Sequence, residues 1–524
     1  MVRFPDSPIF AGFNRPMRFE GDLYDVECVQ GEVPAELDGT FYRVQLDPQY
    51  PARNGDDMPF NWDGMVTSFR FSGGHVDFRS RYVRTPRFVA EREARQALFG
   101  SYRNPYTDDP RVAGIVRGLA NTNVYFHGGR LLASKEDSHP IELDPDTLET
   151  KGEFGWDGAV TSLTATAHPK IDPATGELVF FGYAAKGEST PDIAYYEADA
   201  TGKVVHEAWL VPPYPAMIHD WAVTEHFVVF PVTPLVMDHE RLRAGGSPFA
   251  WDGSRDAYLG VLPRKGGADE VRWYRNTNRF ASHVMNGFDD GRHVYLDTPV
   301  GTTSAFPFFP DVTGKPFDPM ATRAYLSRWH VDTEGPETFD ETKLVGAPGE
   351  FPRMDDRFAA KAYRFGLMSL TDVPGDDRFP PPTGAYRFVA TVAPETGAVD
   401  VYYPGDRTAP QEPCFVPRHP GAGEGDGYVV VVVGRLGELR SDLLVLDAAD
   451  LGAGPVATLA LPFRLRYGLH GNWVDAATLA ARDGGTAATG KMACEGTPSE
   501  QGDTMWSPDQ EHEEAPSNDD RRWI

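Results

Sequence analysis

Apolar and polar residues alternate over short stretches of the chain, and tight turns separate these stretches. In residues 69–78 and 124–133, two alternating runs flank a pair of glycines. Alternation with a period of two is typical of a strand with one buried face, and two successive glycines supply the positive backbone angles of a hairpin turn. Both stretches therefore predict β-hairpins.

Turn sequences recur between further β-like runs, at residues 172–176, 200–203, 289–292 and 395–398. Connections this short join antiparallel strands, so the chain predicts meandering sheets along its length. Repeated hairpins of this kind are compatible with a β-propeller, whose blades protect their edges by closing around a central channel.

Two segments interrupt the strand pattern. Residues 87–117 are the best helical candidate, because residues 91–98 are rich in helix formers. Residues 302–319 are crowded with Phe and Pro and predict loops packed over a pocket. We expect such insertions to cover one face of the sheets.

The end of the chain has a different character. Residues from about 483 to 524 are rich in Gly, Ser, Thr, Asp and Glu and contain few aliphatic side chains, which predicts a disordered or peripheral tail. We therefore expect a lead-in over residues 1–40, a β-rich domain over residues 41–482 and an acidic tail over residues 483–524.

Composition supports an all-β chain and narrows its partners. The 53 Gly, 45 Pro and 12% aromatic residues suit many short strands joined by tight turns. A formal net charge of -27 argues against nucleic acid or an anionic membrane surface as partner, because both need a basic face. The longest aliphatic run, residues 429–433, is too short to span a bilayer.

The cysteines and the N-terminus indicate the compartment. Cys28, Cys414 and Cys494 are far apart and odd in number, so a disulfide framework is not expected. The first residues contain no apolar core of signal-peptide length. We predict a cytoplasmic protein, without stable membrane insertion, that is a monomer or a homodimer.

Four histidines have similar settings, three just before β-like runs and one in the glycine-flanked stretch 467–473. They are His168, His219, His283 and His470. Neutral imidazole suits iron, zinc and copper, so four of them converging would form an all-nitrogen metal site. Position alone leaves a structural role open for each, because scattered histidines are often structural.

The contexts of these histidines resemble those of the four iron ligands in the carotenoid cleavage oxygenase family, which includes the lignostilbene and isoeugenol oxygenases. The resemblance covers residues 41–473. It implies a seven-bladed β-propeller with Fe(2+) on its axis, held by His168, His219, His283 and His470, and a cap of loops and helix over the metal. It also implies O2 as co-substrate.

Three glutamates resemble the acids that support the iron ligands in this family. Glu136, Glu350 and Glu412 stand in matching contexts, and a carboxylate that accepts from the second ring nitrogen fixes the orientation of a ligating histidine. The alternative for each is a solvated surface glutamate. Because three acids serve four histidines, we expect one histidine, His168, to have no such partner.

Tyr102 and Lys135 resemble the pair that contacts a 4-hydroxyl group in the stilbene-cleaving and isoeugenol-cleaving branch. A cation and a hydroxyl donor on one phenol oxygen favour the phenolate, which supplies electron density to a conjugated alkene. The alternatives are an ion pair of Lys135 with a nearby acid and a half-buried cap position for Tyr102. Aromatic candidates for the walls of the substrate pocket are Phe60, Phe306, Phe308 and Phe309.

The resemblance implies an Fe(II) oxygenase that cleaves the C=C bond of 4-hydroxyphenyl alkenes, such as resveratrol, lignostilbene, isoeugenol, 4-vinylguaiacol or coniferyl alcohol. The products would be aromatic aldehydes such as vanillin. Two alternatives are cleavage of carotenoids or apocarotenoids and a non-catalytic, ligand-binding propeller without iron. The remaining histidines singled out lack these contexts and are expected to be structural or exposed: His75, His127, His139, His226 and His293.

Overall fold

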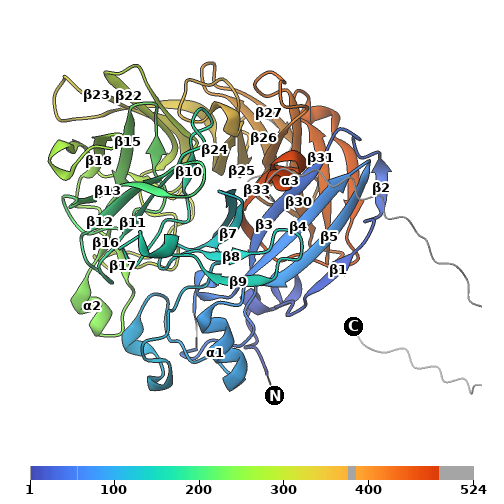
Figure 1. The fold of residues 1–524 in the computed structure, drawn as a ribbon, viewed down its shortest axis with the longest axis horizontal. Coiled ribbons are helices and arrows are strands. Elements are labelled where there is room, and N and C mark those ends of the chain that lie inside the picture. The colour runs from blue at the N-terminus through green and yellow to red at the C-terminus, as the bar shows by residue number, and fades with distance from the viewer. Residues whose placement is uncertain (1, 56, 376–384, 483–524) are drawn as a thin grey trace, which may run out of the picture. The chain divides into compact units, whose positions relative to one another are not determined.

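The computed structural model describes residues 2–55, 57–375 and 385–482. The chain divides into two compact units, Met1–Gly485 and Thr486–Ile524. Cys494 and the predicted tail over residues 483–524 lie outside the described residues. Within the described part, every pair of named strands is antiparallel, and helices are few and short (Figure 1). No helix in this part is long and apolar enough to cross a membrane.

The two ends of the first unit are joined by strand pairing. β33 pairs with β3, and β2 pairs with β32, so early and late strands share two sheets. The first of these sheets has the order β1 (Gly21–Leu23), β5 (His75–Tyr82), β4 (Gly64–Ser72), β3 (Gly39–Leu46), β33 (Gly468–Asp475). Parts of residues 21–40 therefore belong to the sheets, and the expected boundary at residue 41 falls inside β3.

The two predicted Gly-Gly hairpins are confirmed. The first joins β4 to β5, and the second joins the first two strands of the next sheet, with both glycines of each pair at positive φ. That sheet consists of β6 (Asn123–His127), β7 (Arg130–Ser134), β8 (Ile141–Leu143) and β9 (Thr150–Glu153).

Two further four-stranded sheets follow, and three of the predicted turns connect strands as expected. The first contains β10 (Lys170–Ile171), β11 (Leu178–Tyr183), β12 (Ile193–Ala198) and β13 (Val204–Leu210). The second contains β14 (Ala222–Val223), β15 (Phe227–Val232), β18 (Ala257–Pro263) and β19 (Arg272–Asn276), and a separate pair is formed by β16 (Leu235–Met237) and β17 (Phe249–Trp251). The turns at residues 172–176, 200–203 and 289–292 join β10 to β11, β12 to β13 and β21 to β22.

The next sheet has eight strands and is continuous through one long strand, β24. Its members are β20 (Phe280–Ala281), β21 (Asn286–Asp289), β22 (His293–Gly301), β23 (Tyr325–Asp332), β24 (Asp340–Met354), β25 (Gly366–Leu370), β26 (Phe388–Ala393) and β27 (Ala398–Tyr402). The predicted turn at residues 395–398 joins β26 to β27.

The last sheet shows how the core is built. Its strands are β2 (Cys28–Gly31), β32 (Pro455–Ala460), β31 (Arg440–Asp447), β30 (Gly427–Arg435), β28 (Thr408–Pro410) and β29 (Cys414–Pro417). In the valine run of β30, Val430 and Val432 pack in one hydrophobic cluster, whereas Val429, Val431 and Val433 pack in another. A continuous apolar run is typical of a strand whose sheet is covered on both faces.

The helical prediction is only partly correct. The described helices are α1 (Pro86–Ala94), α2 (His239–Arg243) and α3 (Ala476–Ala481). The hydroxyl of Thr85 caps α1 by accepting from the backbone of Phe88, and Arg95 ends it in a left-handed conformation. The helix therefore stops before Leu98, and turns follow it. Residues 302–319 form loops, apart from an isolated bridge between Asp311 and Trp251.

Candidate metal centre and adjoining cavity

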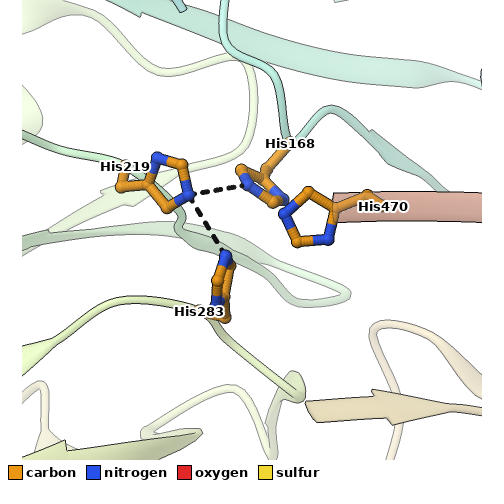
Figure 2. A group of neighbouring side chains, drawn as sticks. All are labelled: His168, His219, His283 and His470. Atoms are coloured by element: carbon orange, nitrogen blue, oxygen red, sulfur yellow. Dashed lines mark hydrogen bonds between the residues drawn. The ribbon is translucent and has the colours of Figure 1, made fainter. Parts of the chain in front are cut away.

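Four histidines from distant parts of the chain meet at one point (Figure 2). One ring nitrogen from each histidine lies within 4.8 Å of those from the other three. His168, His219 and His283 lie in connections just before β10, before β14 and between β20 and β21, and His470 lies in β33. Because each of these elements begins or ends near the same point, the sheets bring together side chains up to 302 residues apart, from 168 to 470.

Three of the histidines are each hydrogen-bonded to a buried glutamate through Nδ1. The distances are 2.5 Å from His219 to Glu136, 2.6 Å from His283 to Glu350 and 2.8 Å from His470 to Glu412. A carboxylate accepts hydrogen bonds, so Nδ1 carries the proton in these three rings and Nε2 keeps its lone pair.

The fourth histidine has no such bond among the described residues. The nearest carboxylate to Nδ1 of His168 belongs to Asp220, at 3.9 Å, which is too long for a hydrogen bond. This geometry agrees with the expectation that none of the three glutamates is the partner of His168.

The nitrogen separations fit a shared cation. Nε2 of His219 lies 3.1 Å from Nε2 of His168 and 3.2 Å from Nε2 of His283. Two nitrogens bound at about 2.1 Å to one ion at a right angle lie about 3 Å apart. His219 and His283 both direct a proton toward a glutamate through Nδ1, so in the neutral rings the facing Nε2 lone pairs repel one another unless a cation lies between them.

The electrostatic surroundings favour neutral imidazole where the rings are most buried. Burial, together with the neighbouring His470, holds the pKa of His168 well below its ordinary value. Burial also lowers the pKa of His470, although Glu412 opposes this shift. Burial would raise the pKa of the Glu412 carboxyl, but His470 and Arg353 hold it below its usual range. A neutral ring beside an ionised carboxylate is the protonation state that metal binding requires.

A cavity of about 390 Å³ adjoins the cluster and brings most of the predicted substrate residues together. His219, His283 and His470 form part of its wall. Its lining also includes Tyr102, Lys135, Phe60, Phe306 and Phe308. Phe309 is buried behind this wall, with its ring 6.1 Å from that of Tyr102 and 5.6 Å from that of Phe306, and it is not part of the lining. Its role is therefore packing against residues that face the cavity.

Lys135 and Tyr102 lie side by side in the lining of this cavity. Nζ of Lys135 is 4.5 Å from the centre of the Tyr102 ring. The same ammonium group forms an ion pair of 2.5 Å with Asp137. Burial lowers the pKa of Lys135, and Asp137 opposes that shift. Burial and the Glu136 carboxylate raise the pKa of Tyr102 well above its usual value, so its hydroxyl remains a neutral donor.

Lys135 and Glu136 lie in the turn that follows β7 and not within a strand. The alternation of side chains along a strand therefore does not explain why the side chains of Lys135 and Glu136 have different partners. The turn itself separates them, since Glu136 bonds to His219 while Lys135 pairs with Asp137.

A polar chain that the sequence did not indicate connects Tyr102 with the metal ligands. Arg103 follows Tyr102 and is buried, and it donates to the hydroxyl of Tyr183 at 2.7 Å. That hydroxyl donates to Glu136 at 2.8 Å, which in turn binds His219. Only the adjacency of Arg103 to Tyr102 is visible in the sequence; the position of Tyr183 in β11 gave no signal of a polar contact.

The other histidines singled out in the sequence lie outside the cluster. Three bind carboxylates on the surface: His75 with Asp25, His226 with Asp289 and His293 with Asp290. His127 and His139 contact backbone carbonyls at 2.9 and 2.7 Å. In the described residues, the grouping that could hold a metal ion comprises only His168, His219, His283 and His470.

Sequence comparison finds similar proteins over most of the chain. A family described as retinal pigment epithelial membrane protein matches residues 14–475. The chain is 46% identical to lignostilbene-alpha,beta-dioxygenase isozyme III of Sphingomonas paucimobilis over 487 residues, which is 91% of this chain and 99% of that protein. It is also 46% identical to isoeugenol monooxygenase of Pseudomonas nitroreducens, over 90% of this chain and 98% of that protein.

Structural comparison agrees with the sequence. The crystal structure of lignostilbene dioxygenase from Pseudomonas brassicacearum superposes with a TM-score of 0.87 and 43% sequence identity. The match covers 91% of this chain and 100% of that one. The resemblance therefore extends through the sheets and the segments between them.

Proposed function

Since the chain belongs to the carotenoid oxygenase family, we propose that it is a non-haem Fe(II) oxygenase that cleaves the C=C bond of 4-hydroxyphenyl alkenes with O2. The observation that carries this proposal is one cavity whose lining includes three members of the four-histidine cluster together with the buried Lys135 and Tyr102. Such a cavity is suited to a small molecule that presents an alkene to the cluster and a hydroxyl group to the lysine.

His168, His219, His283 and His470 would hold the iron, and Glu136, Glu350 and Glu412 would fix the rings of three of them. A ferrous ion held by imidazoles alone supplies electron transfer to dioxygen, which zinc does not. Every other contribution comes from the chain itself. The glutamates keep Nδ1 protonated and Nε2 directed at the ion, and the buried position of the cluster restricts access of water.

Lys135 and Tyr102 would bind the substrate hydroxyl. Tyr102 donates a hydrogen bond as a neutral phenol, and Lys135 places a positive charge beside the substrate oxygen. Both interactions stabilise the phenolate more than the phenol. Electron density from the phenolate reaches a conjugated alkene through the ring, which makes the alkene a better partner for oxygen. Phe60, Phe306 and Phe308 would hold the planar ring, because aromatic side chains pack well on aromatic substrates.

The relatives bear on the substrate class. They are named for lignostilbene and isoeugenol, both of which carry a phenol conjugated with an alkene. We therefore propose that this chain accepts stilbenes such as resveratrol and lignostilbene, or phenylpropenes such as isoeugenol, 4-vinylguaiacol and coniferyl alcohol. Cleavage would release an aromatic aldehyde such as vanillin.

We also propose that the sheets form a seven-bladed propeller with a cap of loops and helix. Support comes from β24, in which Asp340–Lys343 pair with β23 while Gly349–Met354 pair with β25. The eight-stranded sheet then divides into two blades. Together with the five other sheets of four or more strands in the described residues, these make seven, and β16 with β17 belongs to the cap.

The main competing activity is cleavage of carotenoids or apocarotenoids. A long apolar polyene has no group that could accept hydrogen bonds from Lys135 and Tyr102. The presence of these two donors in the cavity lining therefore favours a substrate with a hydroxyl group. A non-catalytic, ligand-binding propeller is the alternative from another class, and it gives no account of four nitrogens arranged around one point.

The proposal extends to the setting of the protein. We propose a cytoplasmic monomer or homodimer without a nucleic-acid partner, supported by the net charge of -27. Cys28 and Cys414 are not in a disulfide among the described residues, which suits a reducing compartment.

Two assays on the purified protein test the function. Metal analysis should find one iron per chain, and a panel of phenolic alkenes should release aldehydes in an O2-dependent reaction. The non-catalytic alternative predicts neither. The carotenoid alternative predicts iron together with a preference for a polyene that has no phenol.

A further inference from the structure

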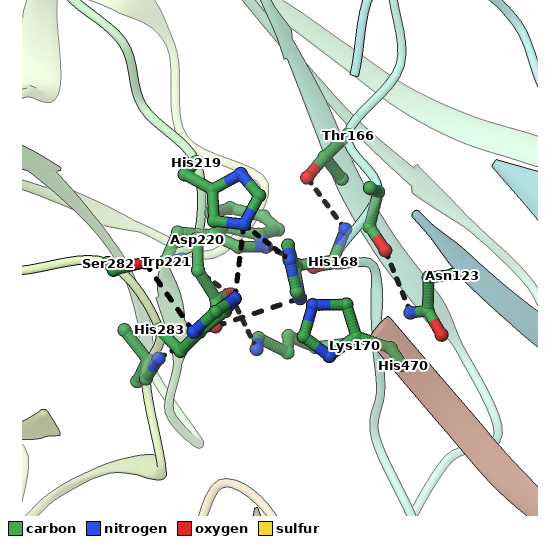
Figure 3. Close-up of polar contacts among 12 residues, drawn as sticks. Asn123, Thr166, His168, Lys170, His219, Asp220, Trp221, Ser282, His283 and His470 are labelled. Atoms are coloured by element: carbon green, nitrogen blue, oxygen red, sulfur yellow. Dashed lines mark hydrogen bonds and ion pairs between the residues drawn. The ribbon is translucent and has the colours of Figure 1, made fainter. Parts of the chain in front are cut away.

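Asp220 follows His219 directly, and its buried carboxylate contacts segments that carry three of the four histidines (Figure 3). Oδ1 accepts from Nζ of Lys170 at 2.7 Å and from the backbone of Trp221 at 2.7 Å. Oδ2 accepts from the backbone of Val284 at 2.7 Å. Lys170 lies two residues after His168, and Val284 directly follows His283, so one side chain links the three connections.

His168 depends on this linkage more than the other ligands do. No glutamate binds its ring, and Nδ1 is 3.9 Å from Asp220. Its main chain is fixed instead, because Nε1 of Trp221 donates to the His168 carbonyl at 2.9 Å and the His168 amide donates to Thr166 at 2.9 Å. Trp221 is in turn bonded to Asp220 through its own backbone amide. The position of the His168 ring is therefore set by the segment that carries Asp220.

Asp220 lies on the side of the cluster away from the substrate cavity. A second cavity, of about 560 Å³, is lined by Lys170, Asp220, His168, His283 and His470. The substrate cavity has His219 in its wall but neither His168 nor Asp220. A change at Asp220 can therefore affect the histidines without altering the walls that would contact the substrate.

We propose that Asp220 is a positioning residue that holds His168, His219 and His283 in register for metal binding. The inference rests on the proposed function, because it assumes that these histidines bind a metal ion. Asp220 acts through the three connections and not as a ligand. It is a fourth supporting acid. It sets backbone positions, whereas the three glutamates orient histidine rings.

The test uses the full-length Asp220→Asn protein, which keeps the shape of the side chain but loses the charge that binds Lys170. We expect its dissociation constant for Fe(II), measured anaerobically by chelator competition, to rise by about 10 to 100-fold, the usual effect of removing a group that supports a ligand. The visible spectrum of the Co(II)-loaded protein should change as well. KM for a 4-hydroxystilbene should stay near the wild-type value, because the substrate cavity is not altered.

Asp442→Asn is the matched control. Asp442 is equally buried and accepts from Nε of Arg435 at 2.6 Å, in a sheet strand that supplies no histidine. Its replacement should lower the melting temperature but leave metal affinity and the Co(II) spectrum unchanged. If Asp442→Asn weakens metal binding as much as Asp220→Asn does, the effect reflects general stability and the inference is overturned.

Two further outcomes keep the inference separate from the function. Wild-type metal affinity and spectrum in Asp220→Asn would overturn the positioning role, while loss of metal from His219→Ala would still support the metal site. If Asp220→Asn does not fold, Lys170→Met removes only the tether next to His168, and unchanged affinity and spectrum in that protein would overturn the inference. A wild-type protein that binds neither Fe(II) nor Co(II) would refute the proposed function itself.

Discussion

The histidine cluster and the Lys135 site, which both contribute to the lining of the substrate cavity, balance their charges in different ways. At the histidine cluster, three glutamates face three imidazoles, and the Nε2 atoms of His219 and His283 lie 3.2 Å apart. At the Lys135 site, the ammonium group is already paired with Asp137 at 2.5 Å. The first arrangement is complete only with a cation, whereas the second is balanced without a ligand.

This difference indicates what each site requires from its ligand. The histidine cluster provides negative charge and lone pairs, which a metal ion would balance. The Lys135 site provides two hydrogen-bond donors, and Asp137 offsets part of the lysine charge, so the site stabilises a phenolate less than an unpaired cation would. We therefore expect substitutions at the histidine cluster to act on metal content and substitutions at the Lys135 site to act on substrate turnover.

The largest effect should follow from removing a ligand. In His219→Ala, one Nε2 of the cluster is lost and Glu136 keeps only its hydrogen bond from Tyr183, so iron binding and aldehyde release should both fall below detection. The sheets keep their own hydrogen bonds and cores, so the far-ultraviolet circular dichroism spectrum should stay close to wild type. Stoichiometric iron with normal turnover in this variant would contradict the assignment.

Lys135→Met should have the next largest effect and leave the iron content unchanged. Loss of one donor that stabilises developing charge lowers kcat by about 100 to 1,000-fold. The variant should also be less stable by about 3–5 kcal/mol, because Asp137 remains buried without its partner.

The double variant Lys135→Met/Asp137→Asn separates these two consequences. It removes both charges, so it should recover much of the stability measured by urea unfolding but none of the activity. Recovery of both would mean that Lys135 serves only as the partner of Asp137.

Removing a supporting glutamate should have a smaller effect. Replacement of Glu136, Glu350 or Glu412 by alanine should weaken iron binding or activity by about 10 to 100-fold, because the ligand remains but its ring is free to turn. Glu197→Ala is a suitable control, since Glu197 is buried and bound to Arg264 at a site without histidine ligands. Equal iron affinity in all four proteins would show that the three glutamates do not support the metal.

The smallest effect should come from Tyr183→Phe, which removes the hydroxyl that links Arg103 to Glu136. A hydrogen bond to a charged group contributes about 1.5–3 kcal/mol, and only part of this reaches the metal, so a several-fold loss of iron affinity is expected. Tyr363→Phe, which removes a hydroxyl bonded to Asp297 at 2.8 Å, provides the comparison. Identical iron affinity in the two variants would confine the role of Tyr183 to packing.

Much of the fold could be predicted from local patterns. Gly73-Gly74 and Gly128-Gly129 form hairpins because each pair adopts positive φ, which most other residues adopt only under strain. The end of α1 could not be predicted from helix propensity, because residues 95–98 are good helix formers. Their conformation is set by specific side-chain contacts, in which the amides of Leu98 and Phe99 donate to the carboxylate of Glu91 in α1.

The site was predictable where a motif surrounded the residue and unpredictable where only the turn geometry mattered. The sequence contexts of the four histidines and three glutamates predict a cluster. The pairing of Lys135 with Asp137 depends on a turn after β7 that no periodicity describes. Asp220 lies in the same motif as His219, but its bonds to Lys170 and Val284 join segments that are distant in the chain.

The most direct test of the account compares 4-hydroxystilbene with 4-methoxystilbene as substrates of the iron-loaded wild-type enzyme. Methylation replaces the proton that must leave to form the phenolate. Lys135 and Tyr102 then have no phenolate oxygen to which they can donate hydrogen bonds. We predict O2-dependent release of 4-hydroxybenzaldehyde from the first compound and no cleavage of the second. Cleavage of both at the same rate, or faster cleavage of a long polyene without a phenol, would contradict the account.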